Sequence, residues 1–143
     1  MVMTEEIYFG NDLAWTGDAR GEIVFASRQK IEVALPAEFG GVEGFLSPED
    51  LFVAAANGCV LTTTLAVAKK HKVALRSYRS EAVGVLESLG DGREVTRIDI
   101  NVKIAADADP QALEEIFAEV ARRAPVIRSM TSSVSIDFEV VDG

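Results

Sequence analysis

The feature that most constrains the fold of this chain is one long apolar stretch in its middle. Residues 51–68 are almost all apolar or small, and a clear helix start precedes them. Ser47 suits the N-cap, Pro48 suits the first helical position, and two acidic residues follow in the first turn. We therefore expect a helix from Pro48 to about Lys70. Because it is apolar on nearly every face, this helix should be surrounded by protein, and two copies of a 143-residue chain would provide that cover better than one.

The same stretch is close to the length that spans a bilayer, so a membrane helix is the first alternative to weigh. Asn57 and the threonines at 62–64 interrupt it, and alanines supply much of its apolar character. These features favour a buried central helix, and we expect no membrane association.

Segments on both sides of this helix carry the residue patterns of strands and of a second helix. Residues 98–104 alternate apolar and polar side chains, and so do residues 134–140. Asp109 and Pro110 open a second helix that runs to Arg123 and that Pro125 should stop. The part before the long helix is β-like at residues 7–9, 13–15, 23–25 and 31–35, which fits either three short strands or a strand and a hairpin, and residues 75–86 form a further expected strand. This order predicts an α+β layer arrangement rather than a βαβ one, in a single domain over residues 1–143.

Charge and cysteine content exclude several classes of function. The net charge is −9 and no block of basic residues occurs, so we expect no nucleic-acid partner. The first residues lack a basic segment followed by an apolar run, and the chain has one cysteine, so we expect a cytoplasmic location. A single cysteine also excludes an intrachain disulfide and multi-cysteine metal sites.

Cys59, within the long helix, is the residue most able to carry chemistry. A lone cysteine in so apolar a helix is more often an inert core residue, and that alternative stays open. His71 is the only histidine and stands more than two turns away, so a cysteine–histidine pair is not expected. Asp107 and Asp109 fit a helix entry better than a metal site, and no phosphate-binding glycine motif occurs. We expect no cofactor and no metal.

The sequence around Cys59 resembles the OsmC/Ohr family of osmotically inducible and organic hydroperoxide resistance proteins. The matching segments are Gly-Gly at 40–41, Ser-Pro-Glu-Asp-Leu at 47–51 and Ala-Ala-Ala-Asn-Gly-Cys at 54–59. The resemblance implies an OsmC-like fold with antiparallel sheets wrapped around a long central helix in an intertwined homodimer. It also implies thiol-dependent reduction of organic or inorganic hydroperoxides.

The resemblance further implies roles for three residues. Cys59 would be the peroxidatic thiolate, and Arg20, or less well Arg28, would be the arginine beside it. A neighbouring guanidinium favours the thiolate, which is the nucleophilic form of a cysteine. Glu49 stands ten positions before Cys59, about 15 Å along a straight helix, so it would act by holding the arginine in a bidentate pair.

One departure from the family pattern separates two hypotheses about function. The family commonly has a second, resolving cysteine in a Cys-Pro-Val segment, where this chain reads Ala124-Pro125-Val126. A one-cysteine peroxidase would reduce hydroperoxides through a sulfenic acid and be recycled by an external thiol or dithiol. The alternative is a non-catalytic OsmC-like protein that binds a small molecule and whose cysteine is vestigial.

Overall fold

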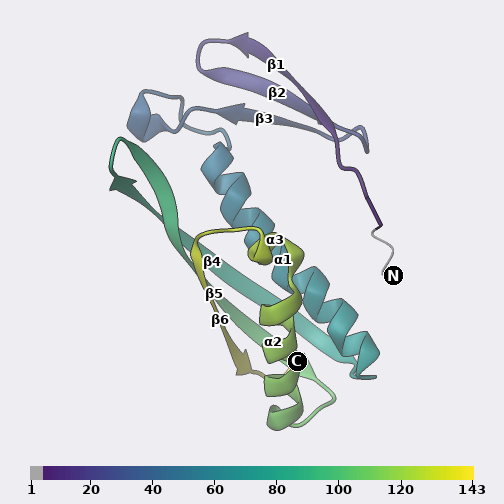
Figure 1. Ribbon diagram of the computed structural model, residues 1–143. Coiled ribbons are helices and arrows are strands. Elements are labelled where there is room, and N and C mark those ends of the chain that lie inside the picture. The colour runs from purple at the N-terminus through teal and green to yellow at the C-terminus, as the bar shows by residue number, and fades with distance from the viewer. Residues whose placement is uncertain (1–4) are drawn as a thin grey trace. The chain divides into compact units, whose positions relative to one another are not determined.

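The computed structural model describes residues 5–143, which form two compact units, one ending at Leu51 and the other comprising Phe52–Gly143. The prediction of a single domain stays a prediction. In chain order the strands are β1 (Asn11–Gly17), β2 (Arg20–Phe25), β3 (Lys30–Ala34), β4 (Leu75–Leu89), β5 (Gly92–Ala106) and β6 (Ser133–Val140). The helices are η1 (Ala37–Phe39), α1 (Pro48–Lys70), α2 (Pro110–Arg123) and α3 (Pro125–Arg128) (Figure 1).

The first unit is an antiparallel sheet in the order β1-β2-β3, followed by a glycine-rich loop. The loop is tied to β3 by a hydrogen bond from the Ala34 amide to the Leu46 carbonyl oxygen at 2.8 Å. A Cβ on Gly41 would lie 1.6 Å from the carbonyl oxygen of Leu35, so only glycine fits there. The hydrogen bond to Leu46 and the close approach at Gly41 therefore fix the path of the loop between β3 and the start of α1.

The alternative of three short strands before the long helix is confirmed, but the β-like residues 7–9 are not part of them, because β1 begins at Asn11. The pairing of β1 with β2 starts at Asn11 and Phe25, which is the last residue of β2. Residues 7–9 extend beyond that end, and no strand in the described part of the chain pairs with them. Apolar side chains alone do not make a strand without a partner for the backbone groups.

The second unit contains a mixed sheet in the order β4-β5-β6. β4 and β5 form a long antiparallel hairpin, whereas β5 and β6 are parallel. The α+β arrangement expected from the sequence is confirmed, but the expectation of antiparallel sheets fails for this one pair. The reason is the connection: α2 and α3 lie between β5 and β6 in the chain and bring it back to the end of the sheet where β5 began.

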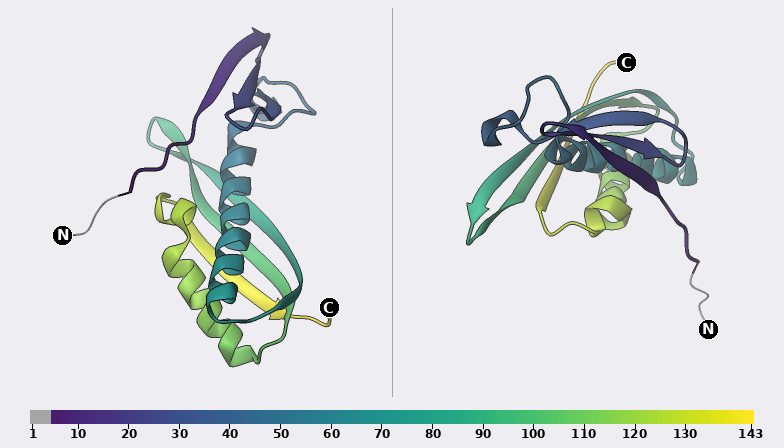
Figure 2. Two further views of the ribbon diagram at one scale, coloured as in Figure 1. Left: turned by 90° about the vertical axis from the view of Figure 1, so that its right-hand side faces the viewer. Right: turned by 90° about the horizontal axis from the view of Figure 1, so that it is seen from above.

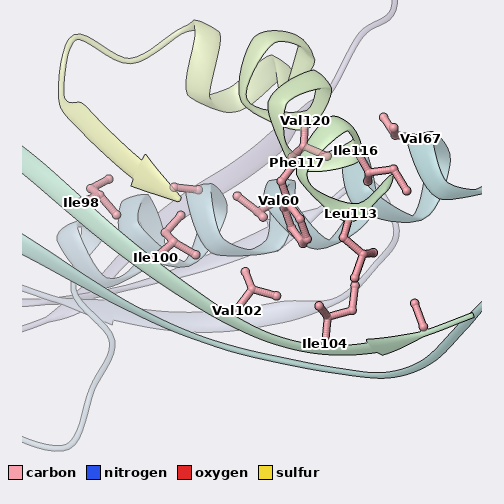
Figure 3. Close-up of a cluster of buried hydrophobic side chains, with 12 residues drawn as sticks. Val60, Val67, Ile98, Ile100, Val102, Ile104, Leu113, Ile116, Phe117 and Val120 are labelled. Carbon is pink, nitrogen blue, oxygen red and sulfur yellow. The ribbon is translucent and has the colours of Figure 1, made fainter. Parts of the chain in front are cut away.

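The core of this unit lies between the sheet and two helices. Both α1 and α2 cover the same face of the sheet (Figure 2). Alternate residues of β5 point into that core, while Asp99, Asn101 and Lys103 between them are more exposed. The helical partners include Val60 and Val67 of α1 and several residues of α2 (Figure 3). The β5 residues are Ile98, Ile100, Val102 and Ile104, and those of α2 are Leu113, Ile116, Phe117 and Val120.

Two contacts fix α1 against β4 near the cysteine. The Ser80 hydroxyl donates a 2.7 Å hydrogen bond to the side-chain oxygen of Asn57. At Gly84 the two elements approach so closely that a Cβ would lie 2.4 Å from a methyl carbon of Val53. The bounds of α1 agree with the prediction from sequence, and these contacts set its position on the sheet.

Within this chain α1 is not surrounded on all sides as the sequence predicted. Ala56, Val60 and Val67 are buried, but Leu65 keeps 48% of its surface exposed. By length and hydropathy alone α1 could also cross a membrane, which for a single helix is weak evidence. Its buried side is part of the core described above, which is the position expected of a central helix.

Candidate active site around Cys59

Cys59 lies on the buried side of α1 and keeps only 6% of its surface exposed. Its sulfur lies 3.7 Å from the hydroxyl oxygen of Thr63, one helical turn further along α1. Residues four positions apart share one side of a helix, so the sequence places this hydroxyl beside the sulfur. Thr62 instead donates its hydroxyl to the backbone carbonyl of Cys59 at 3.3 Å.

The second neighbour of the sulfur comes from the junction between α2 and α3. The backbone N–H of Val126 donates to Cys59 Sγ across 3.4 Å. Pro125 begins α3, so the amide of Val126 lies in a first helical turn and has no carbonyl partner within its own helix. The fully buried Ala124 stands two residues earlier. The structure therefore brings the Ala124-Pro125-Val126 segment to the cysteine.

Together these neighbours suit a negatively charged sulfur. An N–H group and a hydroxyl can both donate to a thiolate, and hydrogen bonds to a charged acceptor are the stronger ones. The amide is held by backbone geometry and the hydroxyl by the helix, so neither must move far when charge develops on the sulfur.

A pocket of about 350 Å³ lies next to this site. Thr63 and Pro125 line it, and these two residues are respectively the hydrogen-bond neighbour of Cys59 and the residue before Val126. The remaining lining residues are Thr62, Ala66, Val67, Lys70, Glu119 and Arg123. The cysteine thus has a pocket beside it with an apolar wall and a charged end.

A buried carboxylate organises the charged end of the pocket. Glu119 accepts hydrogen bonds from His71 Nε2 and Lys70 Nζ, both at 3.1 Å, and pairs with Arg123 at 3.3 Å. The hydrogen bonds from His71 and then Lys70, with a smaller contribution from the Arg123 charge, lower the pKa of Glu119 to about 2. The carboxylate is therefore ionised at neutral pH.

The arginines predicted for the site belong to the first unit. Arg20 begins β2, and its guanidinium lies 3.8 Å from the carboxylate of Asp18 and over the ring of Phe45, 5.1 Å from the ring centre. Its Nε is buried, and the described residues offer it no hydrogen-bond partner. Arg28 is exposed in the turn between β2 and β3 and has a left-handed backbone, with φ of 71°.

Glu49 also belongs to the first unit, in the first turn of α1. The helix start is capped by its neighbours: the amide and hydroxyl of Ser47 bond the Asp50 carboxylate, and the Asp50 amide donates to the Ser47 hydroxyl. Among the described residues no ion pair joins Arg20 to Glu49. Because Cys59 lies in the other unit, the roles of Arg20, Arg28 and Glu49 at the sulfur stay predictions.

Sequence reasoning missed three features of the site: the Thr63 hydroxyl, the Val126 amide and the charged end of the pocket. Thr63 could have been found, because it follows Cys59 by four residues on a helix. The other two depend on contacts between residues nearly 50 or more positions apart, for which one sequence carries no signal. The described part of the chain holds no cluster of residues able to bind a metal ion.

Fold and site together define an α+β protein that holds a lone thiol between a central helix and the junction of two later helices. The family model described as OsmC-like protein matches residues 41–139, so this chain belongs to the OsmC-like family.

Solved structures show the same fold over nearly the whole chain. An OsmC-like protein of unknown function from Vibrio cholerae has a TM-score of 0.82 at 20% identity, covering 95% of this chain and 100% of that one. An organic hydroperoxide resistance protein from Elizabethkingia anophelis has a TM-score of 0.78 at 17% identity, covering 99% and 100%. One from Legionella pneumophila has 0.73 at 18% identity, covering 97% and 100%. Among curated proteins, none matches this sequence.

Proposed function

We propose that this protein is a one-cysteine hydroperoxide reductase that works in the cytoplasm. The observation that carries the proposal is the position of Cys59: its sulfur is held by the Val126 amide and the Thr63 hydroxyl, next to a pocket. Membership of the OsmC-like family supports it, as does the shared fold with two organic hydroperoxide resistance proteins.

The proposed reaction begins with attack of the Cys59 thiolate on one oxygen of the hydroperoxide. A sulfur–oxygen bond forms, the O–O bond breaks, and the leaving alkoxide takes a proton to become an alcohol or, from hydrogen peroxide, water. In this proposal Arg20 stabilises the thiolate and the charge that shifts onto the leaving oxygen. Glu49 holds the guanidinium of Arg20 and acts as a positioning residue.

The sulfenic acid left on Cys59 needs an external reductant. Ala124 stands where the family commonly has its resolving cysteine, and the chain has no other thiol. A small thiol or dithiol from solution therefore completes the cycle, first as a mixed disulfide and then as an oxidised thiol product.

We also propose that the protein is a homodimer. Trp15 and Leu13 of β1 keep 76% and 62% of their surfaces exposed, and Leu65 of α1 keeps 48%. Large apolar side chains left open in this way are typical of surfaces that a partner covers. A second copy is the proposed partner, since most soluble oligomers are symmetric assemblies of one chain.

The test is peroxide consumption by the purified protein with a small dithiol, comparing cumene hydroperoxide with hydrogen peroxide. We expect Cys59→Ser to abolish turnover while keeping the melting temperature close to wild type. Arg20→Ala and Arg28→Ala form a matched pair: the first should lose most of the activity, and the second, in an exposed turn, should keep it.

The competing function is a non-catalytic small-molecule-binding protein, and the 6% exposure of Cys59 favours it. Thiol counting after peroxide treatment separates the two. If wild type shows no turnover and Cys59 remains reduced after exposure to both peroxides, the reductase proposal fails and the binding function replaces it.

A further inference from the structure

The pocket beside Cys59 has a composition that points to one class of reductant. We propose that this pocket binds the recycling thiol, and that the thiol is a small molecule carrying a carboxylate that Lys70 and Arg123 recognise. This inference rests on the proposed reductase function, because it names the partner of the second half of that reaction.

The pocket is in the right place to deliver a thiol to the sulfur. Its wall includes Thr63, whose hydroxyl lies 3.7 Å from Cys59 Sγ, and Pro125, whose next residue donates its amide to that sulfur. Ala124, where a resolving cysteine would stand, directly precedes Pro125. Cys59 itself does not line the pocket, so a thiol bound there would have to pass the same segment that would otherwise supply an internal thiol.

The charges at the far end of the pocket leave a local positive surplus. Lys70 and Arg123 carry two positive charges and Glu119 one negative charge, in a protein whose net charge is −9. The Glu119 side chain is 10% exposed, whereas those of Lys70 and Arg123 are 54% and 55% exposed. The carboxylate is thus enclosed by its partners, while both cations remain open to solvent.

Both cations have donors to spare for an incoming anion. A lysine ammonium has three N–H donors and an arginine guanidinium five. Against Glu119, Lys70 uses Nζ at 3.1 Å and Arg123 uses one terminal nitrogen at 3.3 Å. A ligand carboxylate can therefore form charge-assisted hydrogen bonds with both cations without displacing Glu119.

The size and the walls of the pocket agree with such a ligand. Its volume of about 350 Å³ is that of a small-molecule site. Ala66, Val67 and Pro125 give it apolar walls for a short carbon chain between the two functional groups. The carboxylate end would lie at the cations and the thiol end near Thr63 and Cys59. Lys70 follows Cys59 by eleven residues, about 16 Å along α1, so the flexible side chains of Lys70 and Arg123 would have to extend toward Thr63 to hold a short thiol.

The chemistry balances with two molecules of the thiol. The first thiol attacks the sulfur of the sulfenic acid, a disulfide forms, and the hydroxyl leaves as water with the proton of the thiol. A second thiol then attacks the outer sulfur of this mixed disulfide. Cys59 leaves as thiolate, and the two small thiols depart as their own disulfide.

The first measurement compares three thiols of similar size on the peroxide-oxidised protein: 3-mercaptopropionate, 2-mercaptoethanol and cysteamine. The decay of the sulfenic acid is monitored by trapping the remaining sulfenic acid with dimedone at each time point and measuring the mass of the protein by mass spectrometry. After correction for the thiolate fraction of each reagent, we expect the anionic thiol to react roughly 10-fold faster than the neutral one, and the cationic thiol to be the slowest.

Variants test whether the pocket causes the expected order of reaction rates among the three thiols. Lys70→Gln and Arg123→Gln can still donate a hydrogen bond to Glu119, and each should reduce the preference for the anionic thiol. Lys69→Gln is the matched control, because Lys69 is exposed in the same last turn of α1 and does not line the pocket. If a variant does not fold, wild type provides a second measure: raising the salt concentration should weaken the preference, because both cations are solvent-exposed.

A second measurement needs no peroxide and separates this inference from the proposed function. The reduced protein is mixed with dithiodipropionate, hydroxyethyl disulfide or cystamine, and mixed-disulfide formation on Cys59 is timed. Preference for the anionic disulfide, with no sulfenic acid from any peroxide, would keep the pocket assignment and refute the reductase function. Equal rates for all three reagents, or a charge preference that survives in both glutamine variants, would overturn the inference even if peroxide turnover is normal.

Discussion

Replacing Ala124 by cysteine tests the geometry of the site most directly. The Val126 amide lies 3.4 Å from Cys59 Sγ, and Ala124 stands two residues before it at the end of α2. Ala124 is fully buried, so a thiol at this position would be enclosed next to the cysteine. We expect Ala124→Cys to convert the chain from a one-cysteine protein to one that forms an internal disulfide after peroxide treatment.

The expected gain in stability follows from the loop that the new disulfide would close. The cross-link spans about 65 residues, and the loss of chain entropy in the unfolded state then stabilises the fold by about 4 kcal/mol. Strain lowers this value if the two Cα atoms are not about 5.5–6 Å apart, the usual separation for a disulfide.

Urea unfolding of the oxidised and reduced forms measures this difference, and thiol counting confirms the bond. Ala121→Cys is the matched control, since Ala121 is exposed on α2 and should form no internal disulfide. Non-reducing electrophoresis excludes a cross-link between chains. If Ala124→Cys folds, oxidises no faster than Ala121→Cys and gains no stability, the placement of the 124–126 segment against Cys59 is refuted.

Three further predictions concern the second unit. Glu119→Gln should reduce the loss of unfolding free energy at acid pH. In the wild type the hydrogen bonds from His71 and Lys70 and the charge of Arg123 lower the folded-state pKa of Glu119 from 4.5 to about 2. The stabilisation that the ionised Glu119 carboxylate provides is present above pH 4.5 and is lost as the pH falls towards 2. Urea unfolding of wild type and variant at several pH values measures this difference. Gly84→Ala should cost about 1–3 kcal/mol by overpacking against Val53, and Val53→Ala in the same chain should recover part of that cost in a double-mutant cycle. Ile100→Ala should cost about 2–5 kcal/mol by thermal or urea unfolding, because Ile100 is fully buried at the centre of the sheet.

The parts of the fold that the sequence predicted are those governed by local patterns. Ser47, Pro48 and the acidic residues after them start α1 where the pattern placed it, and Asp109 caps α2 through a 2.8 Å bond to the Ala112 amide. The alternation over residues 98–104 matches the buried residues of β5. Capping and periodicity act over a few residues, so one sequence contains the necessary information.

The failures of prediction concern pairing partners that lie far apart in the chain. Residues 7–9 have apolar side chains but no strand beside them, so their backbone does not join the sheet. β6 has the alternation expected of any half-buried strand, and that alternation is the same whether its neighbour is parallel or antiparallel. The parallel pairing follows from the crossover through α2 and α3, which is a property of the whole unit.

At the candidate site, the sequence singled out Cys59 but not its surroundings. The segment around Cys59 carried a family resemblance, and the matched family confirms it. The Val126 amide is a backbone group, so any residue other than proline at this position could supply it and no side chain marks it in the sequence. The sequence likewise gives no sign that Lys70, Glu119 and Arg123 form a cluster, because each of them alone is typical of a charged residue at a helix end or on a helix surface.

Replacing the resolving cysteine by alanine changes which part of the molecule decides specificity. An internal cysteine would reach the sulfenic acid at a rate set by the fold, whatever the pocket contains. With Ala124 in that place, the proposed cycle makes the rate depend on how well a thiol from solution occupies the space beside Thr63 and Pro125. The proposed role of the two cations is then to bring that thiol to the sulfenic acid, a step that an internal cysteine would perform itself. Ala124→Cys should therefore make the loss of the sulfenic acid insensitive to the charge of the external thiol, although that thiol is still needed to reduce the internal disulfide before the next turnover.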